Sequence, residues 1–325
     1  MERNQAFDVL KGIGIIAVII GHLETLPYYP YRNFVFAFHM PLFFIVAGFF
    51  YNIKPVKVCF KKDFKRLIIP YFFTSIIVLL EFSAYSFYKG NFSRIFEYLF
   101  AIFFCSGSGH SSLIWPIVPC AGPIWFLVAM FWCKTVYNWL RNHHINTVTI
   151  GVISILSTCI DKYLINLPFC ILPGLSAMMF YLLGDLCKQY KFKHFKHKTI
   201  VIFCSIPFFI FCIFYSELFM VKCHYKYYPI DVIGACGGTY LFYKLSTFIV
   251  QSKFKYINSF LTWFGVNSLI VLSFHTIEFH RELWNILNIP NIWSLQLLLK
   301  IIFASLGILL VYRLKLTRIV FCIKK

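Results

Sequence analysis

Two ionisable residues, Lys11 and His22, lie inside the first long apolar stretch of the chain. On a helix their spacing is about three turns, so both side chains point to the same side, about 16 Å apart along the axis. A histidine in an apolar segment can take a proton from a hydroxyl, and a lysine can hold an anion. A structural alternative stays open, in which the lysine reaches toward the end of the helix and the histidine makes a packing hydrogen bond.

Other polar residues are predicted to lie near the depth of His22. His39 follows a short hairpin after the first apolar stretch, and Glu24 is two residues beyond His22. His275 lies in a later apolar stretch, and we expect it at about the same depth in the membrane as His22. Three histidines at one depth on three helices predict a polar chamber, although any one of them alone is more often structural.

A cluster of basic residues precedes the third apolar stretch. Lys62, Lys65 and Arg66 lie within about a turn and a half of helix. Arg66 has the planar guanidinium that makes paired, charge-assisted hydrogen bonds to phosphate. The alternative interpretation of the lysines is that they anchor the cytoplasmic end of a membrane span.

Composition indicates that membrane-spanning helices position these residues. The 325 residues are 60% hydrophobic and 13% charged, with a mean hydropathy of +0.74. Soluble domains have about 45–50% apolar and about 25% charged residues, so a soluble enzyme is excluded. The net charge of +19 comes from short basic clusters between apolar stretches, with no nucleic-acid motif, so we expect no nucleic-acid partner. The 12 cysteines form no C-x-x-C pair, and we expect no metal site.

The sequence predicts an all-α integral membrane protein with both termini in the cytoplasm. Each apolar stretch is long enough to cross the lipid bilayer, and Lys and Arg are concentrated in the loops assigned to the cytoplasm. Residues 92–106 are interpreted as an interfacial or re-entrant piece of a long outer loop. Residues 1–325 are predicted to form one domain with ten spans, near 7–28, 33–52, 67–88, 122–140, 146–165, 169–188, 199–219, 229–249, 260–281 and 295–315.

An ordered set of motifs resembles the acyltransferase-3 family of integral-membrane O-acyltransferases. Each motif is weak alone, but their order along the chain matches that of the family. The segments that carry the resemblance are Phe7–His22, Phe38–Gly48, Arg66–Tyr71, Pro123–Leu127 and Phe264–His275.

The resemblance implies an enzyme that moves an acyl group, by default acetyl, from acyl-CoA to a sugar hydroxyl. Acetyl-CoA would be a co-substrate reaching the enzyme from the cytoplasm, with no bound cofactor. The acceptor would be a cell-surface polysaccharide, such as O antigen, capsule or exopolysaccharide, or its lipid-linked precursor, reached from the outer side. The implied location is the inner or plasma membrane of a bacterium.

The family's site residues transfer by position. His22 matches the catalytic histidine, as a general base or through an acyl-histidine intermediate. Lys11 and Arg66 match basic residues assigned to the donor side. Many members carry a second arginine where Asp63 stands here, so Lys62 or Lys65 is expected to replace it.

The acceptor side is predicted from residues near His22 and from an aromatic side chain suited to sugar rings. The acceptor-side or supporting candidates are His39, Glu24, Trp125 and His275.

Two other functions remain as alternatives. A transporter or flippase for a lipid-linked saccharide would also use several spans and intramembrane charge. The chain shows no repeat relating two halves, which counts against it. A noncatalytic membrane scaffold would leave the histidines without a role.

Overall fold

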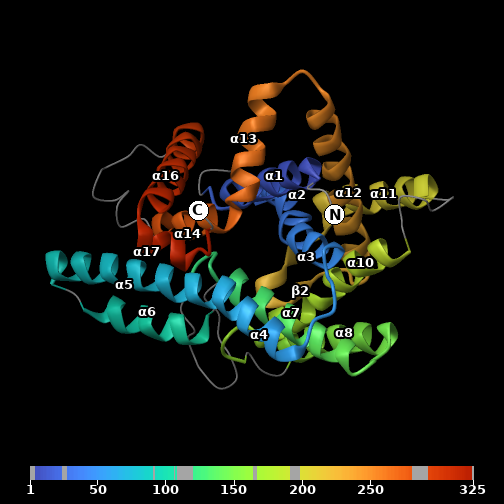
Figure 1. The fold of residues 1–325 in the computed structure, drawn as a ribbon, viewed down its shortest axis with the longest axis horizontal. Helices are drawn as coiled ribbons and strands as arrows, with labels where there is room; N and C mark the ends of the chain where they lie inside the picture. Colours follow the sequence, from blue (N-terminus) through green and yellow to red (C-terminus); the bar gives the residue numbers. More distant parts are fainter. Residues whose placement is uncertain are drawn as a thin grey trace. The chain divides into compact units, whose positions relative to one another are not determined.

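The protein is mostly helical (Figure 1). It divides into two compact units. The computed structural model describes residues 4–23, 28–90, 92–105, 107, 120–163, 167–190, 198–279 and 292–323. Unit 1 comprises Met1–Asn52, Met179–Met220 and His224–Ser268. Unit 2 comprises Ile53–Met178, Val221–Cys223 and Leu269–Lys325.

Unit 1 contains the predicted spans near 7–28, 33–52, 199–219 and 229–249, together with the second half of 169–188 and the first part of 260–281. Its strands pair antiparallel, with Phe219 opposite His224. Its elements are α1 (Gln5–Gly21), the π-helical turn η1 (Tyr28–Arg32), α2 (Asn33–Phe36), α3 (His39–Phe49), nearly all of α10 (Met178–Gln189), α11 (Lys198–Tyr215), β1 (Leu218–Phe219), β2 (His224–Tyr225), α12 (Ile230–Gln251) and α13 (Lys255–Val266). The short helical turn η4 (Met220–Lys222) follows β1.

The core of unit 1 forms where α1, α2, α3, α11 and α12 meet. Leu10, Leu42 and Phe209 are buried together there. Phe38 stacks on Phe242 with a ring-centroid distance of 4.0 Å. This core fixes the ends of α1 and α3, which carry His22 and His39.

Helices α1 and α13 touch backbone to backbone at two glycines. A Cβ atom on Gly12 would lie 2.1 Å from the Leu261 carbonyl oxygen, and one on Gly265 would lie 1.7 Å from the Asp8 carbonyl oxygen. Small residues at a crossing let two membrane helices approach closely and gain dispersion contacts. The glycines therefore set the distance between α1 and α13.

We expect Gly265→Ala to lower the thermal unfolding temperature of the purified protein in detergent. The added methyl group must push α13 away from α1, and overpacking of this kind costs about 1–3 kcal/mol. Ser259→Ala, at an exposed position on the same helix, is the control and should leave the unfolding temperature unchanged. Equal unfolding temperatures for the two variants would contradict the close crossing.

Unit 2 packs its helices in neighbouring pairs. Helix α4 packs on α7, α5 on α6, and α9 on both α7 and α8. Its elements are α4 (Val56–Asp63), the π-helical turn η2 (Phe64–Ile68), α5 (Ile69–Lys89), α6 (Ser93–Phe104), α7 (Trp125–Asn142), α8 (Thr147–Tyr163), α9 (Ile171–Ser176), nearly all of α14 (Ser268–Phe279), α16 (Trp293–Arg313) and α17 (Lys315–Val320).

Helix α16 has the reversed amphipathic pattern of a membrane helix. Its exposed face carries large apolar side chains, among them Leu298, Ile302 and Leu306, while its buried face carries Lys300 and Gly307. A helix of a water-soluble protein has the opposite arrangement, with its apolar face buried and its polar face exposed. The pattern indicates that lipid contacts the exposed face of α16.

Four helical segments in the described part of the chain are long and apolar enough to span a membrane, or five if α13 and α14 count as one broken span. They establish a membrane protein, while the predicted count of ten and the cytoplasmic termini stay predictions. Helix α6 has 12 residues. A helix of that length is about 18 Å long, less than the ~30 Å hydrocarbon core.

Two of the sequence-based span boundaries are corrected by the structure. Residues 260–281 divide into α13 and α14 at Asn267, whose side-chain Nδ2 donates to the Trp263 carbonyl at 2.9 Å. The predicted span 169–188 corresponds to the candidate span Ile171–Gln189, which contains α9 and α10. The first helix ends at Gly21 rather than at residue 28, so His22 is its C-cap.

The predicted topology places Lys57, an exposed residue of α4, in the cytoplasm. We expect Lys57→Cys, in a background lacking all 12 native cysteines, to react with an impermeant maleimide only after the cells are permeabilised. Lys226→Cys, exposed in a predicted outer loop, is the matched control and should react in intact cells. Labelling of residue 57 in intact cells would contradict the ten-span topology.

Candidate functional site

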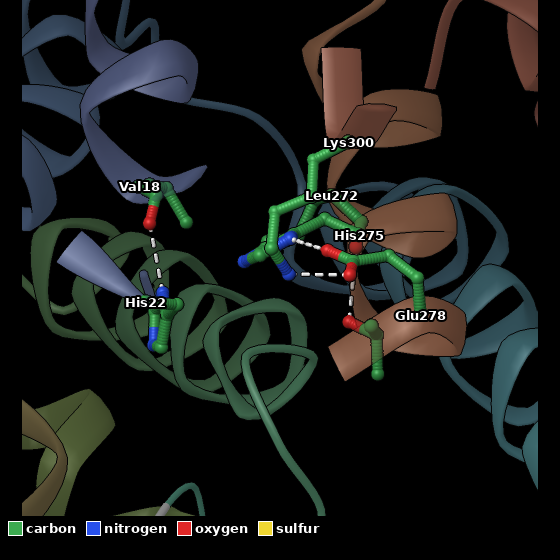
Figure 2. Close-up of polar contacts among 7 residues, drawn as sticks. Val18, His22, Leu272, His275, Glu278 and Lys300 are labelled. Carbon is green, nitrogen blue, oxygen red and sulfur yellow. Dashed lines mark hydrogen bonds and ion pairs between the residues drawn. The ribbon is translucent and has the colours of Figure 1, made fainter. Parts of the chain in front are cut away.

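His22 is oriented by the last turn of its own helix. Its Nδ1 lies 2.8 Å from the Val18 carbonyl oxygen, as Figure 2 shows. A carbonyl only accepts, so Nδ1 carries the hydrogen, and in the neutral ring the lone pair lies on Nε2. The side chain is half-buried. This is the tautomer and exposure that a general base needs.

His39 has the same local geometry and lies against the same phenylalanine. Its Nδ1 is 2.6 Å from the Val35 carbonyl oxygen, and its side chain is buried. The Phe36 ring centroid is 6.2 Å from that of His22 and 5.0 Å from that of His39. Two imidazoles with hydrogen-bonded Nδ1 atoms therefore contact one aromatic ring in unit 1.

A third histidine, His224, extends this cluster and was missed from the sequence. Phe219 contacts Phe36 at 5.4 Å between ring centroids, and His224 contacts Phe219 at 6.4 Å. His224 lies on β2, in a segment that was interpreted as an outer loop. The aromatic residues next to His224 in the sequence could have indicated a packed segment. They could not predict the pairing of β1 and β2 that brings His224 to Phe219.

An ion pair within α1 fixes the position of Lys11. Lys11 forms an ion pair with Asp8 one turn earlier, with a distance of 2.8 Å between Nζ and the carboxylate. About a quarter of the Lys11 side chain stays exposed, 28%. Asp8 was not considered from the sequence. The lysine is thus held at a fixed place on α1 and is still accessible.

In unit 2, His275 belongs to a buried charged network with Glu278 and Lys300. His275 Nδ1 lies 2.5 Å from Glu278 Oε1, and Lys300 Nζ forms an ion pair with Glu278 Oε2 (Figure 2). The three side chains are at most 7% exposed. With His275 neutral, one negative and one positive charge balance, which is the arrangement that burial tolerates.

Lys300 had a signal in the sequence, because a lysine inside an apolar span is costly without a partner. Sequence reasoning placed Lys300 in a span but assigned it no role. The partner, Glu278, lies 22 residues earlier on another helix. Such a pair becomes visible only when the register of the two helices is known.

The predicted donor-side residues lie at the junction of α4 and α5. Lys62, Lys65 and Arg66 are exposed there, before the apolar stretch that begins at Leu67. Asp63, which lies between Lys62 and Lys65 in the chain, is buried and forms an ion pair with Lys134 of α7.

The remaining candidates differ in how far the structure describes them. Trp125 begins α7 and is buried, with its ring against Gly107, where a Cβ atom would lie 2.1 Å away. Glu24 lies outside the described residues. In the ranges that the structure describes, no three His, Cys, Asp or Glu side chains are grouped closely enough to hold a metal ion.

Comparison with known proteins gives one family and one relative. The model of the acyltransferase domain family matches residues 4–313. Over 57 residues the chain is 40% identical to "Nodulation protein NolL" of Sinorhizobium fredii (strain NBRC 101917 / NGR234), a match that covers 15% of this chain and 16% of that protein. No solved structure matches.

Proposed function

The chain belongs to the acyltransferase-3 family, and on this premise we propose that it transfers an acetyl group from acetyl-CoA to a hydroxyl of a cell-surface saccharide. The observation that supports this most directly is the geometry of His22. Its position matches the family's histidine, and its ring is fixed with Nδ1 on a backbone carbonyl and the lone pair on Nε2.

In the proposed reaction, His22 Nε2 takes the proton of the acceptor hydroxyl as its oxygen attacks the thioester carbonyl. The C–S bond breaks, the CoA thiolate leaves, and the proton passes from the imidazolium to the thiolate or to water. A positioned general base contributes about 10²–10⁴-fold to the rate. Lys11, ion-paired with Asp8 on the same helix, is a cation available to the donor.

The acceptor side is proposed to include the imidazole of His39. Phe36 contacts the rings of both His22 and His39, so an apolar sugar face stacked near Phe36 would lie close to both imidazoles. We further propose that the enzyme works in the cell membrane of a bacterium, with the donor on the cytoplasmic side and the saccharide on the outer side.

Measurement of CoA release tests this proposal. The purified protein in lipid nanodiscs, given acetyl-CoA and acceptor oligosaccharide, should form equal amounts of free CoA and acetyl ester, both measured by mass spectrometry. Movement of a lipid-linked saccharide across vesicles without CoA release would establish the transporter alternative and overturn the proposal.

A further inference from the structure

The hairpin of β1 and β2 has two unlike faces. Leu218 pairs with Tyr225, and Phe219 pairs with His224. Side chains directly opposite each other on antiparallel strands share a face, and neighbours along a strand lie on opposite faces. Leu218 and Tyr225 are buried, whereas Phe219 and His224 are half-buried. One face of the hairpin therefore anchors it in unit 1, and the other leaves an aromatic ring and an imidazole partly open.

The half-buried face continues the aromatic surface on which His22 and His39 lie. The Phe219 ring packs on Phe36, the ring that both of those histidines contact. His224 contacts Phe219 in turn, so this series of ring contacts begins at His22 and ends at His224. Such a surface suits a sugar, because aromatic rings pack on its apolar faces and imidazole nitrogens bond to its hydroxyl groups.

A buried carboxylate, that of Asp231, holds both ends of the hairpin. Ser216, two residues before β1, donates from its hydroxyl to Asp231 Oδ1. The amide N–H of Tyr227, two residues after β2, donates to Asp231 Oδ2 at 2.8 Å. Asp231 is 1% exposed and lies in the first turn of α12, where the helix dipole favours a carboxylate. One side chain therefore ties down the chain on both sides of the hairpin.

The same hydrogen bonds reach α2, the helix that carries Phe36. Asn33 Nδ2 donates to the Ser216 carbonyl at 2.9 Å. Asn33, Ser216 and Asp231 are all buried, and we call these three residues the hairpin brace. Asn33 begins α2 and Phe36 ends it. The brace therefore fixes the hairpin relative to α2 and keeps Phe219 against Phe36.

Resting on the proposed function, in which the reacting hydroxyl lies at His22 Nε2, we propose that Phe219 and His224 form one wall of the acceptor site. His224 is a specificity-determining residue that hydrogen-bonds a second hydroxyl of the saccharide, away from the one that is acylated. Asp231 is a positioning residue, which acts through the hairpin and does not touch the saccharide.

Two observations favour an acceptor wall over a loop that only connects two spans. A connecting loop needs length but no fixed position, whereas buried side chains here hold the hairpin at both ends. The predicted topology also places this segment, between the spans 199–219 and 229–249, on the outer side. That is the side from which the saccharide arrives in the proposed function.

Steady-state kinetics of the full-length protein in lipid nanodiscs test the role of His224. The probes are acetyl-CoA and oligosaccharides cut from the surface polysaccharide of the native cell after base has removed its esters. We expect His224→Ala to raise the KM for the oligosaccharide about threefold to tenfold, the contribution of one hydrogen bond. The kcat and the KM for acetyl-CoA should stay unchanged. Lys226→Ala, exposed two residues later, is the matched control and should keep the wild-type values.

Variants of the brace test the role of Asp231. Asp231→Ala should raise the same KM, because the hairpin loses its attachment, and Asp231→Asn should keep it near the wild-type value. An amide can replace both bonds, since its oxygen accepts from the Tyr227 N–H and its nitrogen donates to the Ser216 hydroxyl oxygen. Ser216→Ala removes only one bond, so it serves if Asp231→Ala does not fold, and it should raise the KM in the same direction.

Binding measured without turnover separates this wall from the proposed reaction. Saturation-transfer NMR reports contact between the protein and the same oligosaccharides. If the wild type forms acetyl ester and folded His224→Ala keeps its KM for the oligosaccharide, the wall is overturned and the proposed function stands. Weaker binding by His224→Ala, with no CoA release by the wild type, would support the wall and reject the proposed function.

The remaining outcomes also decide. A wild-type protein that neither binds nor acylates the oligosaccharides would overturn both the wall and the proposed function. Folded Asp231→Ala and Ser216→Ala proteins with the wild-type KM would overturn the positioning role of Asp231.

Discussion

Acyl transfer is expected to fall at least about 100-fold when His22 is replaced by glutamine, because a general base contributes 10²-fold or more. Glutamine keeps a polar side chain of similar reach, so it can still bond to the Val18 carbonyl, but it cannot accept the hydroxyl proton. The amount of folded protein and the affinity for acyl-CoA should stay unchanged. Turnover per folded molecule is measured as CoA release.

The chain offers a matched control for this variant in His143. It is the C-cap of α7, as His22 is of α1, and its Nδ1 lies 3.0 Å from the Trp139 carbonyl four residues earlier. His143→Gln therefore makes the same substitution in the same local geometry at an exposed helix end, and turnover should be unaffected. If His22→Gln retained more than ~10% of wild-type turnover, the base would have to be reassigned to His39.

Breaking the buried network of unit 2 is expected to destabilise the protein strongly. Lys300→Met leaves the carboxylate of Glu278 buried beside His275 without its cation. Removing one partner of a buried ion pair costs about 3–5 kcal/mol. The free energy of unfolding, measured by denaturant titration in mixed micelles, should fall by that amount.

Two comparisons show whether lost charge balance is the cause. Lys315→Met removes an exposed lysine just beyond α16 and should change the free energy of unfolding by less than about 0.5 kcal/mol. Glu278→Gln combined with Lys300→Met removes both charges and should recover most of the lost stability. A double variant as unstable as Lys300→Met would contradict the charge-balance explanation.

The sequence predicted the long apolar helices well because membrane spans depend on length and composition. The predicted span 295–315 corresponds to α16 (Trp293–Arg313), and 67–88 corresponds to α5 (Ile69–Lys89), which is part of the candidate span Val56–Lys89. The short hairpin before His39 likewise indicated that His39 would lie near His22, and Phe36 contacts both rings. These inferences needed only local information.

What the sequence could not predict depends on pairing between distant helices. At the break the Asn267 side chain bonds back to the Trp263 carbonyl, and an asparagine in the sequence does not by itself reveal that it ends a helix. The partners of Asp63 and Glu278 lie on other helices, 71 and 22 residues away. His224 joins the aromatic cluster only because β1 and β2 pair.

The orientation of His22 also has a consequence for how enzymes of this kind could diversify. The bond that fixes its ring joins residues only four positions apart, within a single helix end. Substitutions on α2, β1 or β2 would then change the surroundings of the imidazole, and so the acceptor that fits there, without disturbing its tautomer. The choice of acceptor and the proton-transfer chemistry would then change independently of each other during evolution. Exchange of the segments near Phe36 between relatives should therefore yield active enzymes with altered acceptors.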